Sequence, residues 1–139
     1  MSVQVEKTLD LATCLALRHQ VFVREQGVPV EEEEDAHDPT ATHFLALADG
    51  RPVGTARIVV EGDTGKIGRV CVLKTHRGTG LGAALIRACL DDLRSAGIRR
   101  ARLGAQLTAT GFYQKLGFTV TSGIYDDAGI PHVDMERPL

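Results

Sequence analysis

The sequence predicts one domain of the α/β (α+β) class, in which helices flank a mixed central sheet. Three observations support this prediction. Short apolar runs that are typical of strands alternate with amphipathic stretches that are typical of helices, and turns containing glycine separate them. Hydrophobic residues make up 43% of the 139 residues, which suits one domain with a buried core. We therefore expect residues 1–139 to form a single domain.

The N-terminal part of the chain predicts a strand, a helix and a polar connection. Asp10 can cap the helix, whose apolar residues recur at helical spacing and share a stripe with the stem of Arg18. We expect Gly27 and Pro29 to end this helix, because both residue types are common just past helix ends. Residues 28–42 are polar and acidic, and we expect them to form the connection to the next strand.

The rest of the chain predicts strands interrupted by two helices. Strands are expected at residues 44–48, 52–60 and 66–73, with turns at 49–50 and 62–65. A helix is expected over residues 81–96, because its apolar residues fall on one face and Gly97 suits the position after a helix end. The remaining expected elements are a strand (99–103), a helix (108–116) and two strands (118–125 and 132–137) joined by a loop (126–129).

A turn dense in glycine, Arg77-Gly78-Thr79-Gly80-Leu81-Gly82, lies between a buried strand and the helix at residues 81–96. Its backbone N–H groups lie at the positive end of the helix dipole and can bind an anion. Glycine tolerates positive φ, and its missing Cβ lets phosphate oxygens approach the main chain. Arg77 adds a positive charge with several donors. We therefore predict a pyrophosphate site at residues 77–82.

Two other phosphate-binding patterns fit this turn less well. A P-loop requires Gly-Lys-Ser/Thr, which the chain lacks. The dinucleotide fingerprint G-x-G-x-x-[GA] is matched by Gly78, Gly80 and Ala83. However, the acidic ribose ligand expected about 20 residues further on would fall at the basic residues 100–102. Too few residues also follow Gly82 for the second half of a doubly wound sheet.

The turn also fits a third pattern, [RQ]-x-x-G-x-[GA], through Arg77, Gly80 and Gly82. Together with residues 68–73, it resembles the acetyl-CoA pyrophosphate signature of the GNAT superfamily of N-acetyltransferases. Residues 106–118 resemble the N-x-x-A-x-x-F-Y-x-K-L-G-F stretch of the same superfamily, with Gln106 in place of the usual asparagine. Further segments, at residues 17–29, 38–43 and 129–135, are similar to the ElaA-like branch of the superfamily.

The resemblance implies the GNAT acyl-CoA N-acyltransferase fold and an enzyme that moves an acetyl group from acetyl-CoA to a primary amine of a small molecule. The reaction would proceed by direct attack in a ternary complex. The implied acetyl-CoA site consists of Val70, Cys71, Val72, Arg77, Gly78, Thr79, Gly80, Leu81, Gly82, Gln106 and Tyr113. Three alternatives stay open: another acyl donor, a hydroxyl acceptor, and a CoA-binding sensor module without catalysis.

Tyr113 matches the tyrosine that serves as a general acid in the superfamily. A phenol has an unperturbed pKa of about 10, so it is protonated at neutral pH and can donate to a leaving thiolate. The alternative is that Tyr113 only packs beside Phe112.

Three residues are candidates for the general base or for acceptor binding. Glu25 ends the first helix, where a carboxylate could take the ammonium proton or form an ion pair or a cap. His132 and His43 begin strands on the expected acceptor side, although a lone histidine is more often structural. The acidic residues 31–35 are either a solvated loop or a means of attracting a cationic amine.

Composition argues against several other functions. The net charge of −2 and the aromatic content of 4% give no support for nucleic-acid binding. Cys14, Cys71 and Cys89 are widely spaced, so we expect neither a disulfide framework nor a metal site. The first residues do not resemble a secretion signal, and no apolar run reaches the roughly 18 residues that a membrane span requires. We expect a cytoplasmic protein without a membrane partner, and a homodimer is one alternative to a monomer.

Overall fold

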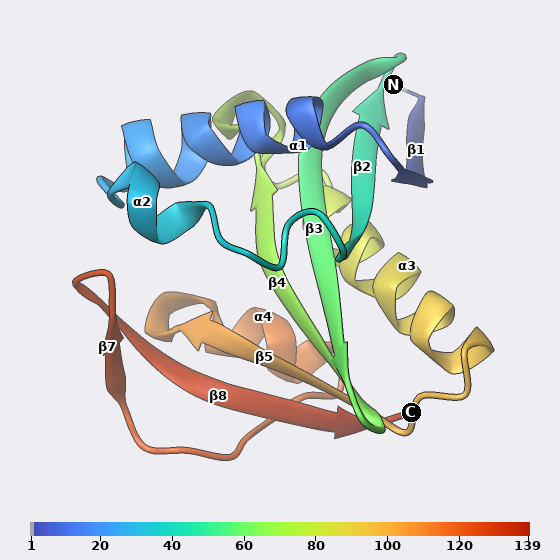
Figure 1. The fold of residues 1–139 in the computed structure, drawn as a ribbon, viewed down its shortest axis with the longest axis vertical. Coiled ribbons are helices and arrows are strands. Elements are labelled where there is room, and N and C mark those ends of the chain that lie inside the picture. The colour runs from blue at the N-terminus through green and yellow to red at the C-terminus, as the bar shows by residue number, and fades with distance from the viewer. Residues whose placement is uncertain (1) are drawn as a thin grey trace.

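The structure, a computed structural model that describes residues 2–139, is built on one eight-stranded sheet (Figure 1). The strands are β1 (Val3–Thr8), β2 (Thr42–Ala48), β3 (Arg51–Glu61), β4 (Thr64–Val72), β5 (Arg100–Gln106), β6 (Thr119–Val120), β7 (Tyr125–Asp127) and β8 (Ile130–Pro138). Their order is β1-β2-β3-β4-β5-β8-β6, and β7 also pairs with β8. Only β4 and β5 are parallel, so the sheet is mixed, as predicted.

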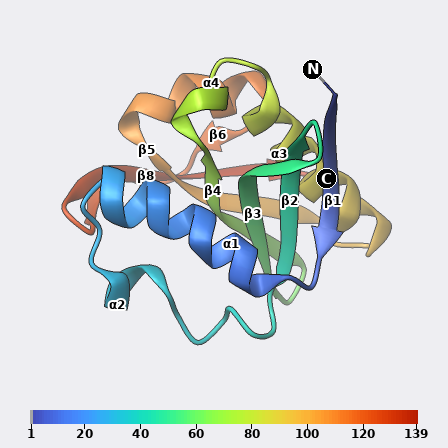
Figure 2. The same ribbon diagram turned by 90° about the horizontal axis from the view of Figure 1, so that it is seen from above.

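Helices cover both faces of this sheet. The α-helices are α1 (Leu11–Arg18), α2 (Val30–Glu33), α3 (Leu81–Ser95) and α4 (Thr110–Lys115). A π-helix (His19–Glu25) continues α1, and short 3₁₀ turns lie at Lys74–His76 and Leu107–Ala109. Figure 2 shows α1 in front of the central strands and α3 behind them. Within residues 2–139, no helix has the length and apolar character needed to cross a membrane.

The core follows from the alternation of side chains along β2. Phe44 and Ala46 point to the face covered by α3, where they join Leu85 of that helix. Leu45 points to the opposite face and packs against Cys14 of α1. Successive strand residues face opposite sides of a sheet, so one apolar strand serves both helices. The apolar stripe of α3 buries its side chains against the larger of the two clusters.

The predicted fold class is confirmed, but four local predictions differ from the structure. The first helix changes from α to π geometry at His19, and the connection at residues 28–42 contains the short helix α2. The expected strand at residues 118–125 is divided into β6 and β7. It is divided because, between the two strands, Asp134 N–H donates to Ser122 Oγ at 2.8 Å instead of continuing the backbone ladder. The expected loop at residues 126–129 is a tight turn, with positive φ at Ala128 and Gly129.

The sheet opens between its two parallel strands. β4 and β5 pair only where residues 64–66 face residues 100–102, and beyond this point the strands diverge, as Figure 1 shows. The distal half of β4 is therefore held by β3 alone. The register of β3 and β4 also shifts between Thr55 and Arg57, so that Arg69 and Val70 together oppose Ala56. This arrangement is a β-bulge, and it lies beside the opening.

Candidate active site

A cavity of about 530 Å³ occupies the opening between β4 and β5. Both diverging strands line it, together with the end of the π-helix, part of α2, α4 and the β7–β8 hairpin. The cavity therefore collects side chains from segments that are up to 111 residues apart, from Val21 to His132. Most of the polar groups predicted from the sequence can be placed by reference to this cavity.

The distal half of β4 presents to the cavity backbone groups that no neighbouring strand pairs. Leu73 N–H donates to Val53 O of β3 at 2.8 Å. Because backbone groups alternate in direction along a strand, Val72 and Val70 turn theirs to the other side, where β5 has moved away. The neighbouring Cys71 is buried, and burial raises the pKa of its thiol to about 12. This thiol stays protonated at neutral pH and is therefore a poor nucleophile.

The turn at residues 77–82 has the geometry of an anion site. Gly78 and Gly80 have φ values of 77° and 84°, in the left-handed region that glycine adopts without strain. Gly80 is the N-cap of α3, and the N–H groups of the first helical turn point outward at the positive end of the dipole. Gly82 lies against α4, since a Cβ built there would be 3.4 Å from Phe112 Cζ. Thr79 Oγ1 donates to His76 O at 2.5 Å and closes the turn.

Arg77 is paired with Glu25 beside this turn. Its two terminal nitrogens donate to the Glu25 carboxylate at 2.6 and 2.8 Å, and its Nε donates to Val72 O at 2.9 Å. The hydrogen bond from Arg77 lowers the pKa of Glu25, which makes this carboxylate a weaker base. Glu25 lies outside the cavity lining, so its visible role is to join the end of the π-helix to the glycine turn.

The residue after Glu25 spans the cavity. Gln26 lines the cavity, and its Oε1 accepts a hydrogen bond of 3.0 Å from Gln106 Nε2 at the end of β5. The π-helix positions it, because the Gln26 N–H bonds to Val21 O, five residues earlier, at 3.0 Å. The sequence showed Gln26 as part of a motif but carried no signal for this contact, which joins residues 80 positions apart.

Tyr113 lies on α4 and lines the cavity. Its ring packs edge-on against Phe112 and Phe118, at centroid distances of 5.0 and 6.0 Å. Burial raises the pKa of its hydroxyl to about 12, so the phenol is protonated at neutral pH. The ring therefore packs against the core while the residue also lines the cavity, and this position is compatible with either role considered from the sequence.

His132 lies on β8 and lines the cavity. Its Nδ1 lies 2.7 Å from Ile130 O. A carbonyl oxygen only accepts, so the neutral ring carries its hydrogen on Nδ1 and keeps a lone pair on Nε2. The ring stacks on Tyr125 with centroids 5.9 Å apart. Tyr125 is held in turn by its hydroxyl, which donates to Asp134 Oδ1 at 2.7 Å over the flat surface of Gly104.

His43 has a different environment. It is buried on β2, its Nε2 donates to Asp38 O at 2.8 Å, and it does not line the cavity. Its cross-strand neighbour is Arg57. The structure therefore separates His43 from His132, although both were expected near the acceptor.

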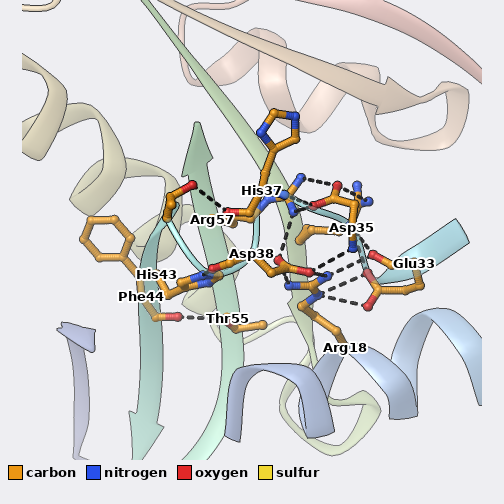
Figure 3. A network of polar contacts seen from close by, with 11 residues as sticks. Arg18, Glu33, Asp35, His37, Asp38, His43, Phe44, Thr55 and Arg57 are labelled. Carbon is orange, nitrogen blue, oxygen red and sulfur yellow. Dashed lines mark hydrogen bonds and ion pairs between the residues drawn. The ribbon is translucent and has the colours of Figure 1, made fainter. Parts of the chain in front are cut away.

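A largely buried network of three arginines and three carboxylates adjoins the cavity, which its members Glu33 and Arg69 line (Figure 3). Arg18 donates to Glu33 at 3.0 and 3.1 Å and to Asp38 at 2.7 and 3.1 Å. Arg57 donates to Asp35 at 2.7 Å and to Asp38 at 2.9 Å. Burial alone would raise the pKa of Asp38, but the hydrogen bonds from Arg18 and the Asp35 N–H hold it well below its usual range. The charges balance, as buried charges must.

This network corrects the expectation for the acidic residues 31–35. Glu33 is 3% exposed and fully engaged with arginines, so it is neither solvated nor available to attract an amine. The other glutamates of the segment are exposed, and among them Glu32 lies at the cavity wall. One feature of the sequence could have predicted this network. Arg57 and Arg69 interrupt apolar strands, and charged side chains in such positions require buried partners of opposite charge.

Comparisons with known proteins agree with this geometry. Residues 6–139 match the family described as Acetyltransferase (GNAT) domain. A Bacillus subtilis (strain 168) protein, provisionally named an acetyltransferase, is 41% identical over 131 residues, which cover 92% of this chain and 89% of that protein. The crystal structure of Escherichia coli ElaA is 30% identical and superposes with a TM-score of 0.88 over 98% of this chain and 99% of that chain. An acyl-CoA N-acyltransferase from Pseudomonas aeruginosa is 29% identical, with a TM-score of 0.86 and 98% of both chains covered.

Proposed function

The chain belongs to the GNAT acetyltransferase family, and we propose that it transfers an acetyl group from acetyl-CoA to a primary amine of a small molecule. One observation carries this proposal: a single cavity joins the open backbone of β4 to Tyr113 and His132, and Arg77 of the glycine turn lies at its edge. We also infer that residues 1–139 act as one domain, since the family match covers residues 6–139.

The glycine turn and β4 are the proposed acetyl-CoA site. The outward N–H groups of Leu81 and Gly82 and the positive end of α3 suit a pyrophosphate. The pantetheine arm contains amides, so it can pair with the Val70 backbone and the Val72 N–H as an added strand would. Gln106 lies further along the same cavity and offers a side-chain amide to this arm.

The proposed reaction is direct attack in a ternary complex. His132 Nε2 takes a proton from the acceptor ammonium, and the neutral amine then attacks the thioester carbonyl. A carbon–nitrogen bond forms, and backbone N–H groups of β4 stabilise the negative charge on the carbonyl oxygen. The carbon–sulfur bond breaks as Tyr113 donates its proton to the departing thiolate, and the new amide nitrogen loses its remaining extra proton to the Tyr113 phenolate, which restores the phenol. Alignment of the two substrates supplies a large part of the rate enhancement.

The base is assigned to His132 in preference to Glu25. His132 lines the cavity and has a free lone pair, whereas Glu25 lies outside the lining and its pKa is lowered by Arg77. Glu25 is instead proposed to hold the π-helix against the glycine turn. A small acceptor fits the cavity volume of about 530 Å³, and Glu32 at its wall favours a cation.

A panel assay tests the proposal. The purified protein is incubated with acetyl-CoA or longer acyl-CoA donors and with small amines or alcohols, and release of the CoA thiol is followed. We expect turnover with acetyl-CoA and at least one primary amine. Faster turnover with alcohols or longer acyl donors would replace this substrate assignment. Tight CoA binding measured by calorimetry, with no thiol release from any pair, would indicate a sensor module.

A further inference from the structure

The strand that forms the proposed oxyanion site contains an arginine in a conformation that arginine rarely adopts. Arg69 has a φ of 53°, within the left-handed region that disfavours residues with a Cβ. It is the first residue of the bulge in which Arg69 and Val70 together oppose Ala56. An arginine keeps such a backbone only where its surroundings impose it.

No sheet partner imposes this conformation from the cavity side, because β5 leaves β4 after Lys66. The side chain of Arg69 makes the compensating contacts. Its Nε donates to Glu33 O at 3.0 Å and lies 2.9 Å from Glu33 Oε2. Its Nη2 donates to Asp35 Oδ2 at 3.1 Å. The bulge is therefore tied to α2 and to the segment that follows it.

Glu33 and Asp35, which anchor the Arg69 side chain, are themselves held by other arginines. Glu33 is 3% exposed and accepts hydrogen bonds of 3.0 and 3.1 Å from Arg18, which is 1% exposed. Asp35 is held by Arg57 of β3 at 2.7 Å. Arg69 thus connects the cavity strand to a buried network that spans α1, α2 and β3. A network of paired buried charges has few alternative arrangements, so it can fix the position of a strand that lacks a neighbour.

We propose that Arg69 is a positioning residue for acetyl transfer: its anchored side chain holds the bulge that turns the Val70 N–H toward the thioester carbonyl. This inference rests on the proposed function in one respect, the use of β4 backbone donors. Arg69 does not touch the reacting atoms in this mechanism. It acts through Val70.

Variants at Arg69 separate the effect of its side-chain contacts from the effect of its strained backbone conformation. Arg69→Gly removes the anchor but keeps a residue that adopts positive φ without strain, whereas Arg69→Ala removes the anchor and keeps the strain. We expect both to lower kcat by about 10- to 100-fold at saturating substrates, because small misplacements at the reacting centre have effects of this size. Arg69→Lys can restore one contact to the anchor and should retain more activity. Arg51→Ala, at an exposed arginine of β3, is the matched control and should match the parent.

Two measurements distinguish positioning from general stability. The first is kcat per folded molecule, with CoA affinity measured separately; a purely structural role would lower Tm and leave this kcat unchanged. The second is the residual dipolar coupling of the Val70 amide resonance in NMR spectra, which reports the direction of the N–H bond and should change in the Arg69 variants and not in the control. Parental kcat in folded Arg69→Gly overturns the inference. If the glycine and alanine variants fail to fold, Arg69→Met replaces them, because it keeps much of the side-chain length but makes no ion pair with Glu33 or Asp35, and parental kcat with an unchanged Val70 coupling in that variant overturns the inference.

The same experiments keep this inference separate from the proposed function. If the parent protein turns over no acceptor, the proposed function fails, while the Val70 coupling still reports whether Arg69 sets the bulge. If the parent is active and the folded glycine variant is equally active, the proposed function stands and Arg69 has no positioning role.

Discussion

Replacing Gly80 with aspartate tests the anion site most directly, because the structure separates charge from every other effect of the substitution. Gly80 has φ 84° and ψ 3° and caps α3. A Cβ at this position meets no atom within 4 Å, so the side chains of aspartate and asparagine, which have the same shape, both start in open space. Both variants bear the same left-handed backbone strain, roughly 1 kcal/mol. Gly80→Asn is therefore a matched control that differs from Gly80→Asp by one charge.

The expected effect of that charge follows from Coulomb's law. At a separation of ~6 Å and an effective dielectric constant of ~20, one carboxylate and one phosphate charge repel by about 2.8 kcal/mol. We therefore expect CoA to bind the aspartate variant about 100-fold more weakly than the asparagine variant. Calorimetric titration with CoA measures this ratio. The ratio should shrink at about 1 M salt, where the screening length is roughly 3 Å.

Two results would contradict the anion site. The first is equal CoA affinity for the aspartate and asparagine variants at low salt, with both proteins folded. The second is an equal loss for pantetheine, which carries no phosphate and should not respond to the charge.

Three further predictions follow from the cavity and the buried network. Tyr113→Phe should lower kcat by ~10- to 1000-fold in a thiol-release assay and change acetyl-CoA affinity little, because it removes only the proton donor; equal kcat would leave Tyr113 a packing role. Gly104→Ala should lower kcat/KM for the amine without changing CoA affinity, because its Cβ would lie 2.7 Å from the Tyr125 hydroxyl and displace the ring that supports His132; unchanged kinetics would separate Tyr125 from catalysis. The lowered pKa of Asp38 means that its stabilisation is complete above the unfolded pKa and is lost as pH falls through the folded value. The free energy of unfolding, from urea titrations, should therefore fall below about pH 5, and a flat profile down to pH 3 would contradict this.

Features that depend on neighbouring residues could be predicted from the sequence. The glycine turn is one example, because positive φ at Gly78 and Gly80 and the start of a helix directly after them are properties of a short segment. Tyr113 is another, since its motif places it on a short helix with aromatic neighbours. The alternation of strands and helices also followed from local hydrophobic periods.

Features that depend on distant partners could not be predicted. Arg18 was assigned only a buried stem, because its partner Glu33 lies 15 residues away on a segment that seemed to be a polar loop. Glu25 was a candidate base until Arg77, 52 residues away, was found to pair with it. His43 and His132 are similar in sequence context, and only the sheet order places one in the network and the other in the cavity.

The sequence by itself therefore determined the family, most of the order of the elements and the conformation of the glycine turn, because these depend on side-chain periodicity and on backbone conformations that single residues permit. The tertiary structure alone decided which charges are paired and which groups face the cavity. Ion pairing depends on distances between residues such as Arg69 and Glu33, which lie 36 positions apart. The opening of the sheet depends on where β4 and β5 stop pairing, and neither strand encodes that point without the other.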